Sequence, residues 1–136
     1  MEEDSHSDDE ILEILKRRKV VVVGMSKNPD KAAHYVPKYL HEHGYDITPV
    51  NPNSDVILKK QCYDEVTDVP DEIDIVDVFR PSDQVLPIIK EAIKKNPKVI
   101  WLQEGIHNEE AEQLARDEGI DVVFNRCMLA EHRRLV

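Results

Sequence analysis

The strongest constraint on the fold is a run of four valines near the N-terminus. Residues 19–24 read Lys-Val-Val-Val-Val-Gly. Valine is β-branched and favours strands, and an apolar run without polar alternation is typical of a strand that is buried on both faces. Such strands occur almost only in parallel sheets with helices packed on each side. The run therefore predicts an α/β protein.

Four further segments read as strands of the same sheet. Each is rich in apolar residues and runs into a polar turn that contains Gly, Pro or Asn. They span residues 46–50, 73–79, 98–103 and 121–124. The pattern predicts about five strands in all.

Helical patterns alternate with these strands. Segment 36–43 stops at Gly44 and carries Pro37, which we expect in the first turn of a helix. Ser82 or Asp83 is expected to cap the next helix, which runs to about residue 95. Each of these helices lies between two predicted strands, as in βαβ units.

The last helix in this series has clear signals at both ends. Asn108 is a favourable cap, Glu109 and Glu110 lie in the first turn, and Gly119 follows the end. Strands and helices thus alternate along the chain, and right-handed crossovers place helices on both faces of one sheet. The fold class that we expect is α/β, a Rossmann-like doubly wound sheet of about five parallel strands with helices on both faces.

The domain organisation follows from length. The chain has 136 residues, enough for one core and too few for two ordinary ones. Residues 1–9 read as an acidic flexible tail, and residues 10–136 as a single domain. Ser7 and Glu10 match a capping box for a short helix at the start of this domain. The irregular segment 53–70 gives no clear pattern.

Composition excludes several classes of partner. The formal net charge of −10 argues against nucleic acid, which is bound by clustered Lys and Arg. No apolar run is long enough to span a membrane. Cys62 and Cys127 lie too far apart in sequence to indicate a zinc site or a disulfide framework, and His34, His41 and His43 lack the spacing of metal ligands. We expect a cytoplasmic protein without a metal, and we expect these three histidines to lie on the surface.

Ligands of doubly wound sheets bind beyond the carboxyl ends of the strands. The polar turn after the first strand contains Gly24, which permits close approach of the backbone to a phosphate, and two lysines, Lys27 and Lys31. Arg80 follows the third strand and is suited to a bidentate phosphate contact. The G-x-G-x-x-G pattern of NAD-binding proteins and the P-loop pattern are both missing, so the ligand is a phosphate-bearing molecule of another kind.

Five segments at the strand ends carry a resemblance to a known family. They are Val23-Gly24-Met25-Ser26, Pro49-Val50-Asn51-Pro52, Asp77-Val78-Phe79-Arg80, Trp101-Leu102-Gln103-Glu104-Gly105 and Asn125-Arg126-Cys127-Met128. In this order and at this spacing they resemble the stand-alone CoA-binding proteins, whose fold is that of the CoA-binding domain in the succinyl-CoA synthetase α-subunit. The resemblance extends from about residue 15 to the C-terminus. Met25 and Met128 depart from it, since the family often has alanine and proline there.

The resemblance implies coenzyme A as the cofactor and assigns each part of it to a strand end. It places the pyrophosphate on the loop Gly24, Met25, Ser26 and Lys27. It places the adenosine near Asn51, Pro52, Phe79 and Arg80, and the pantetheine arm along Gln103, Glu104, Gly105 and Ile106. The sequence itself adds Lys31 as a third cation, beside Lys27 and Arg80, for the phosphates.

The expected function is non-catalytic binding of CoA or an acyl-CoA, as a carrier, sensor or regulatory module whose protein partner the sequence does not name. The alternative is an enzyme acting on a CoA thioester or another nucleotide, because Glu104, His107 and Cys127 follow strands that end at one edge. A third reading is an interaction domain that has lost its ligand. In the synthetase, the phosphorylated histidine belongs to a second domain.

Overall fold

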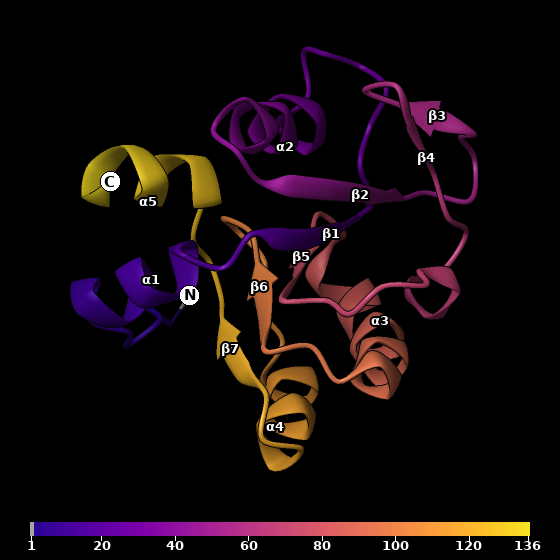
Figure 1. The fold of residues 1–136 in the computed structure, drawn as a ribbon. Coiled ribbons are helices and arrows are strands. Elements are labelled where there is room, and N and C mark those ends of the chain that lie inside the picture. Colours follow the sequence, from indigo (N-terminus) through magenta and orange to yellow (C-terminus); the bar gives the residue numbers. More distant parts are fainter. Residues whose placement is uncertain (1) are drawn as a thin grey trace.

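The computed structural model describes residues 2–136 and contains one five-stranded parallel sheet with helices on both faces (Figure 1). The strand order is β2-β1-β5-β6-β7. The strands are β1 Lys19–Val23, β2 Asp46–Val50, β5 Ile75–Val78, β6 Val99–Leu102 and β7 Asp121–Val123. The predicted fold class is confirmed, and all five predicted strands are present.

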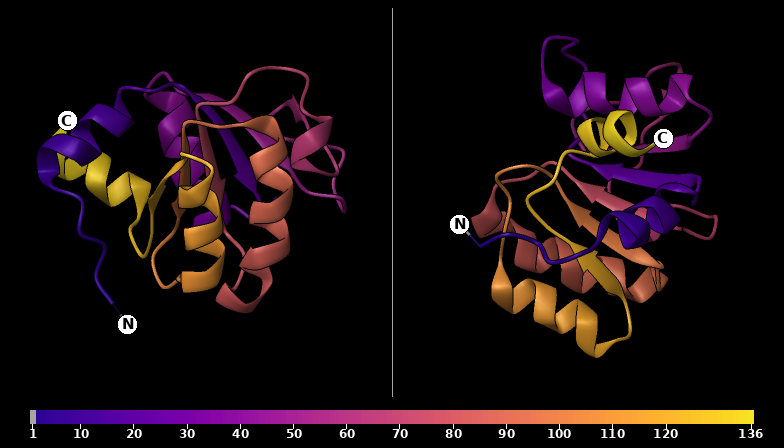
Figure 2. Two further views of the ribbon diagram at one scale, coloured as in Figure 1. Left: turned by 90° about the horizontal axis from the view of Figure 1, so that it is seen from below. Right: turned by 90° about the vertical axis from the view of Figure 1, so that its left-hand side faces the viewer.

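Five α-helices surround the sheet in two layers (Figure 2). They are α1 Asp8–Leu15, α2 Ala32–Glu42, α3 Val85–Ala92, α4 Glu109–Asp117 and α5 Met128–Leu135. Helices α1, α2 and α5 cover one face, and α3 and α4 cover the other. None of the described helices has the length and apolar character that crossing a bilayer requires.

The valine run divides its side chains between the two faces. Val20 and Val22 belong to the core beneath α1, α2 and α5, whereas Val21 and Val23 belong to the core above α3 and α4. Side chains alternate along a strand, so a run with no polar residue supplies both cores at once. This is the physical reason why the run predicted the fold.

Two of the expected helix caps are confirmed. The Ser7 hydroxyl accepts from the Glu10 N–H, and the Glu10 carboxylate accepts from the Ser7 N–H, which completes the capping box of α1. The Asn108 side chain accepts from the Ala111 N–H at the start of α4. The local sequence alone determines both caps.

Two other helix starts differ from the prediction. Helix α2 begins at Ala32, so Pro37 lies inside the helix and not in its first turn. Because proline lacks an N–H, the carbonyl of Ala33 is free, and it accepts from the Ser26 N–H at 3.1 Å. The proline therefore ties the β1–α2 loop to the helix. A loop of the tertiary structure supplies the missing partner, which the sequence pattern does not show.

Helix α3 also lacks the predicted cap. The 3₁₀ turn η2 Ser82–Gln84 comes first, and neither Ser82 nor Asp83 caps α3. The Ser82 hydroxyl instead accepts from the His107 N–H at 3.0 Å. The helical stretch ends as predicted, through a second 3₁₀ turn, η3 Ile93–Lys95.

The segment without a clear pattern forms a small hairpin, β3 Val56–Ile57 and β4 Lys60–Gln61, followed by the 3₁₀ turn η1 Val66–Asp68. Tyr63 then bonds to the backbone on either side of Val50 and continues the pairing at the β2 edge. At the opposite edge, Asp4 and His6 lie against β7 and Arg126. The flexibility of the tail and the extent of the domain stay predictions.

The topology creates a crevice between β1 and β5. From β1 the chain passes to β2 on one side of the sheet, and from β5 to β6 and β7 on the other. Helices α2 and α3 leave these two neighbouring strands on opposite faces (Figure 2). Ligands of open α/β sheets bind at this switch point.

Candidate functional site

Three cavities adjoin one another along the carboxyl edge of the sheet. The α3 cavity, of about 560 Å³, is lined by Val50, Asn51, Pro52, Asp64, Glu65, Asp83, Gln84, Ile88 and Glu91, among others. The loop cavity, of about 420 Å³, is lined by Gly24, Met25, Ser26, Lys27, Lys31, Asn51, Ser54 and Phe79, among others. The α2 cavity, of about 350 Å³, is lined by Ala32, Ala33, Tyr35, Val36, Phe79, Gln103, Glu104, Ile106 and Cys127, among others. Arg80 lines all three.

The junction of the three cavities requires a glycine at position 24. Gly24 has a φ of +83°, and a Cβ there would lie 2.8 Å from Arg80 Cδ and 3.0 Å from the Phe79 carbonyl oxygen. The missing side chain thus lets the Arg80 side chain cross over the end of β1. Gly24 positions the cation as well as turning the chain.

The β1–α2 loop is held by its own hydrogen bonds and leaves two N–H groups free. The Ser26 hydroxyl accepts from the Asn28 N–H, and the His34 ring bonds to the Ser26 carbonyl at 2.7 Å. The N–H groups of Met25 and Lys27 donate to no residue that the structure describes. Free N–H groups in a braced loop are suited to a phosphate.

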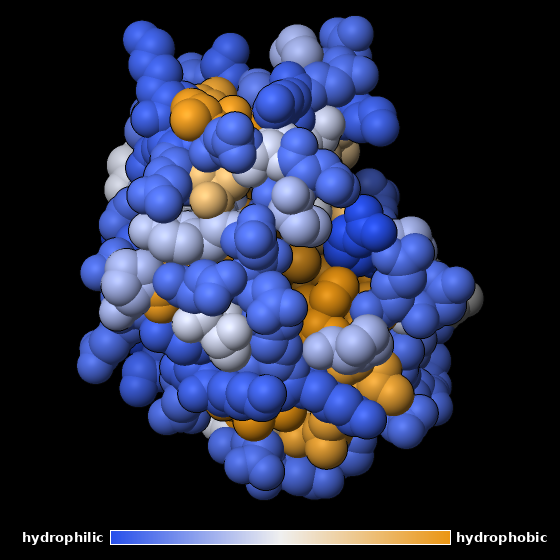
Figure 3. All heavy atoms as spheres, turned by 90° about the vertical axis from the view of Figure 1, so that its right-hand side faces the viewer, coloured by the Kyte–Doolittle hydropathy of each residue, from blue (hydrophilic) through white to orange (hydrophobic). Residues whose placement is uncertain are grey.

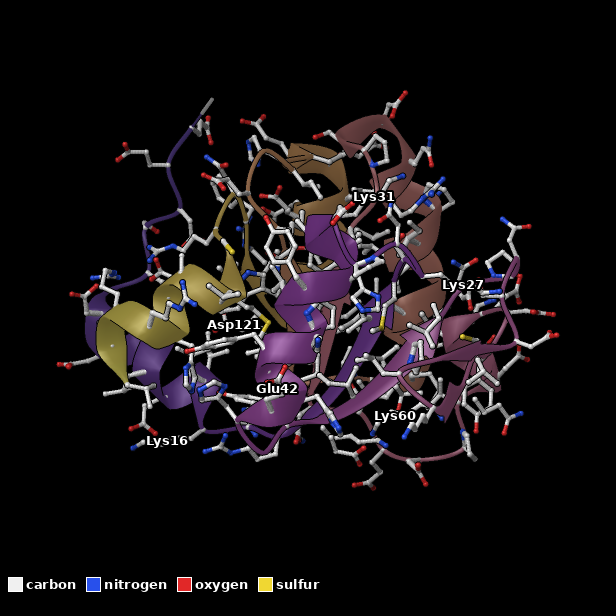
Figure 4. The ribbon with its side chains drawn as sticks, turned by 90° about the horizontal axis from the view of Figure 1, so that it is seen from above. Lys16, Lys27, Lys31, Glu42, Lys60 and Asp121 are labelled. Atoms are coloured by element: carbon white, nitrogen blue, oxygen red, sulfur yellow. The ribbon has the colours of Figure 1, made fainter. Side chains whose placement is uncertain are left out.

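The start of α2 adds to this anion site. Lys31 is its N-cap residue, and its side chain makes no capping hydrogen bond to the first N–H groups of the helix. Lys31 lies at the end of α2 opposite to Glu42 (Figure 4). Helix dipole, lysines and free N–H groups all favour negative charge in the loop cavity.

Asn51 connects this loop to the end of β2. Its side-chain amide donates to the Met25 carbonyl at 2.8 Å, and its side-chain oxygen accepts from the Asn53 N–H. Both polar ends of the side chain are therefore engaged. Asn51 lines the α3 and loop cavities as a brace between them.

The α3 cavity has an apolar interior and an acidic rim. Val23, Val50, Val66 and Ile88 contribute apolar surface, while four carboxylates, Asp64, Glu65, Asp83 and Glu91, lie around it. The side of the molecule formed by the small hairpin and α3 shows an apolar strip flanked by hydrophilic side chains (Figure 3). Arg80 donates to Gln84 Oε1 at 2.5 Å and does not pair with Asp77 or Asp83. A flat apolar ring with hydroxyl donors fits this lining better than a phosphate does.

The α2 cavity combines apolar walls with two polar residues of the β6 turn. Tyr35 is 47% exposed at its border, and Gln103 is 4% exposed. Cys127 also lines the cavity, and burial raises the pKa of its thiol. At neutral pH this cysteine is therefore a thiol rather than a reactive thiolate.

Twelve of the thirteen predicted cofactor-binding residues line these cavities. Gly105 is the exception; its N–H donates to Asn125 Oδ1 at 2.7 Å, and it shapes the turn. Four further lining residues, Tyr35 and Val36 of α2 and Glu65 and Glu91 beside α3, were not predicted from the sequence. Predicting them would have required the correct start of α2 and the position of η1 Val66–Asp68. Both depend on tertiary contacts.

His107 does not join Glu104 and Cys127. Its Nδ1 lies 2.6 Å from Glu112 Oε2, and its ring stacks on Phe124 at 4.1 Å between centroids. The expectation that these three side chains converge is wrong for His107. Surface placement is also wrong for His34, which is 9% exposed.

A crevice at the switch point of a doubly wound sheet, with free N–H groups and cations at its centre, defines a Rossmann-like protein of the nucleotide-binding class. Comparison with known families makes this class more specific. The sequence model described as "CoA binding domain" matches residues 18–133. The chain belongs to this CoA-binding domain family.

Similar proteins fall into two groups. A hypothetical protein from Pyrococcus horikoshii is 44% identical, with a TM-score of 0.94 and 99% of both chains covered. The "Uncharacterized protein YneT" of Bacillus subtilis is 39% identical, over 90% of this chain and 92% of its own length. The "Acetate--CoA ligase [ADP-forming] II" of Archaeoglobus fulgidus is 32% identical over 74% of this chain, which corresponds to only 15% of the ligase.

Proposed function

We propose that this protein binds coenzyme A, or an acyl-CoA, across the carboxyl edge of its sheet and performs no chemistry on it. The observation that carries the proposal is the position of Arg80, where three cavities of different chemical character meet. Family membership supports CoA as the ligand. Binding as a carrier, sensor or regulatory module is the role that follows.

The three cavities match the three parts of CoA. The apolar α3 cavity takes the adenosine, with carboxylates near enough to the rim to accept from ribose hydroxyls. The loop cavity takes the pyrophosphate against the N–H groups of Met25 and Lys27. The α2 cavity takes the pantetheine arm. Every residue that was predicted to bind the cofactor, Gly105 apart, has a place in this arrangement.

The acidic rim constrains the 3′-phosphate. Asp64, Glu65, Asp83 and Glu91 would repel a phosphate inside the α3 cavity, where Arg80 is the one cation among the described lining residues. We therefore place the 3′-phosphate at the border with the loop cavity, within reach of Lys27 or Lys31. This arrangement uses all three cations on the ligand's phosphates.

The enzyme alternative has lost part of its support. It rested on Glu104, His107 and Cys127 lying together, whereas His107 is paired with Glu112 and is not among the residues that line the α2 cavity. The ADP-forming ligases are similar to this chain over a small part of their own length, so their reaction is not carried over. Binding alone accounts for the geometry.

Isothermal titration of the ligand-free protein with CoA, and in parallel with NAD, tests the proposal. We expect saturable one-to-one binding of CoA and no binding of NAD. Arg80→Ala removes charge-assisted hydrogen bonds, each contributing about 1.5–3 kcal/mol, and should weaken CoA binding by about tenfold to a hundredfold. Arg17→Ala is the matched control, because Arg17 is exposed at the end of α1, far from the crevice.

Binding of NAD alone, or of neither ligand, would contradict the proposal. Equal losses in Arg80→Ala and Arg17→Ala would show that general charge, and not the junction of the cavities, holds the ligand. Turnover of acetyl-CoA or succinyl-CoA by the pure protein would overturn the non-catalytic part and leave the binding part intact.

A further inference from the structure

A carboxyl group lies buried beneath the α2 cavity without a charged partner. Asp77 of β5 is 0% exposed, and it sits between Val22 of β1 and Trp101 of β6 in the register of the sheet. Its Oδ2 atom has no hydrogen-bond partner among the described residues. An ionised carboxylate in such surroundings is costly unless it is paired, so the position calls for an explanation.

Among the described residues, the Asp77 side chain has one hydrogen-bond partner, and this partner leads into the cavity. Gln103 Nε2 donates to Asp77 Oδ1 at 2.6 Å. Gln103 follows Trp101 by two residues, so its side chain lies on the same face of the sheet as Asp77. Gln103 is itself a lining residue of the α2 cavity. The pair thus connects the buried core to the wall of the cavity.

The contact orients the Gln103 amide. One N–H of Nε2 points to Asp77, and the Oε1 atom on the other side of the amide has no partner among the described residues. An acceptor held in this way is complementary to an N–H donor and unfavourable for a carbonyl or a phosphate. Phe79 and Ile106, which also line the cavity, are apolar and offer Gln103 no alternative partner.

We propose that Asp77 is a positioning residue that holds Gln103 so that its Oε1 accepts a hydrogen bond from an amide N–H of the pantetheine arm. The inference rests on the proposed function, and it names the recognised group as a secondary amide. Asp77 does not touch the ligand and acts only through Gln103.

The protonation of Asp77 agrees with this role. Burial raises the pKa of its carboxyl to about 7, against a smaller opposing effect of the Gln103 hydrogen bond. Burial is the largest cause of the raised pKa of the Cys127 thiol, and the charges of Asp77 and Glu104 add to it. No cation is among the groups that shift Asp77. Below about pH 7 the carboxyl is therefore mostly neutral, and in either state one of its oxygens can accept from Gln103 Nε2.

The test compares two ligands that differ in the arm. CoA carries pantetheine, and adenosine 3′,5′-bisphosphate lacks it. Gln103→Leu and Asp77→Leu should each weaken CoA binding by about threefold to tenfold, the range for one neutral hydrogen bond, and leave binding of the bisphosphate unchanged. Asp77→Asn keeps an acceptor for Gln103 Nε2 and should bind CoA within about twofold of the original chain.

Gln113→Leu is the matched control, since Gln113 is exposed on α4 and bonds only to Asp117. Unchanged CoA affinity in Gln103→Leu would overturn the inference, and so would equal losses for both ligands. A loss in Asp77→Asn as large as in Asp77→Leu would reduce Asp77 to a packing role. If the original chain binds neither ligand, the proposed function fails. If it binds both and the variants match it, only the positioning role fails.

Discussion

At the scale of single residues, both the fold and the site depend on the absence of a Cβ atom at Gly24. Gly24→Ala combines a left-handed φ of +83° with contacts of 2.8 and 3.0 Å to Arg80 and Phe79. We expect a loss of about 2–4 kcal/mol in the free energy of unfolding, from backbone strain and overpacking together. Urea unfolding followed by circular dichroism measures it.

Gly119→Ala is the control that separates the two effects. Gly119 has a φ of +78°, and a Cβ there would meet nothing within 4 Å. Gly119→Ala should therefore lower the free energy of unfolding only through backbone strain, by about 1–2 kcal/mol. Equal losses at both positions would mean that Arg80 moves aside freely, and the argument that Gly24 positions the cation would then be wrong.

Residue positions predicted which side chains gather at one edge of the sheet, but not which of them are buried. Gly24 and Gln103 stand directly after strands, Lys27 and Arg80 lie in the turns that follow, and the carboxyl ends of parallel strands meet at one edge. The burial of Asp77 was not predicted, because an aspartate within an apolar strand looks the same whether its partner is water or Gln103. Burial depends on contacts between distant segments, which a single sequence does not show.

At the scale of elements, strands were easier to predict than helix starts. The central strands are buried on both faces and consist mostly of apolar residues, so a short local run is enough to recognise them. Helix α2 begins earlier than predicted because Ser26 satisfies the carbonyl that Pro37 leaves free. The hairpin β3–β4 has two residues in each strand, too few for any period to appear. The start of α2 and the hairpin β3–β4 depend on tertiary contacts and were therefore not predicted from the sequence.

The N-terminal segment is held to β7 by an ion-pair cluster. His6 Nε2 lies 2.8 Å from Asp121, its Nδ1 lies 2.9 Å from Asp4, and Arg126 Nε lies 3.0 Å from Asp4. Hydrogen bonds to Asp121 and then to Asp4 raise the pKa of His6 from 6.5 to about 10. The folded protein therefore binds the His6 proton more tightly than the unfolded chain does.

This shift predicts a pH-dependent contribution to stability. A raised folded-state pKa stabilises fully below about pH 6.5, and the stabilisation is lost as pH rises towards 10. His6→Gln should lower the free energy of unfolding near pH 6 by about 1 kcal/mol after solvent screening, and the difference should shrink steadily as pH rises from 6.5 to about 10. Chemical unfolding at several pH values measures it. His41→Gln, exposed on α2, should show no such trend, and a constant His6→Gln difference would contradict the ion-pair account.

At the scale of the whole molecule, one sheet serves two cores. Val20 and Val22 pack with Trp101 beneath α2 and α5, while Val21 and Val23 pack with Ile89 against α3. Each strand is buried on both faces, so loss of the helices on one face would expose apolar strands that the other layer also needs. The two layers should therefore unfold together.

Trp101 makes this testable, since it is the single tryptophan of the chain and is 0% exposed. Ile89→Ala opens a cavity in the opposite core and should cost about 2–5 kcal/mol. If the layers are coupled, Trp101 fluorescence and circular dichroism give one urea midpoint in the original chain, and both midpoints fall equally in Ile89→Ala. A fluorescence midpoint that stays in place while the circular dichroism midpoint falls would mean that the layers unfold separately. The crevice lies between helices of both layers, so separate unfolding would also let one wall of the site open while the other stayed folded.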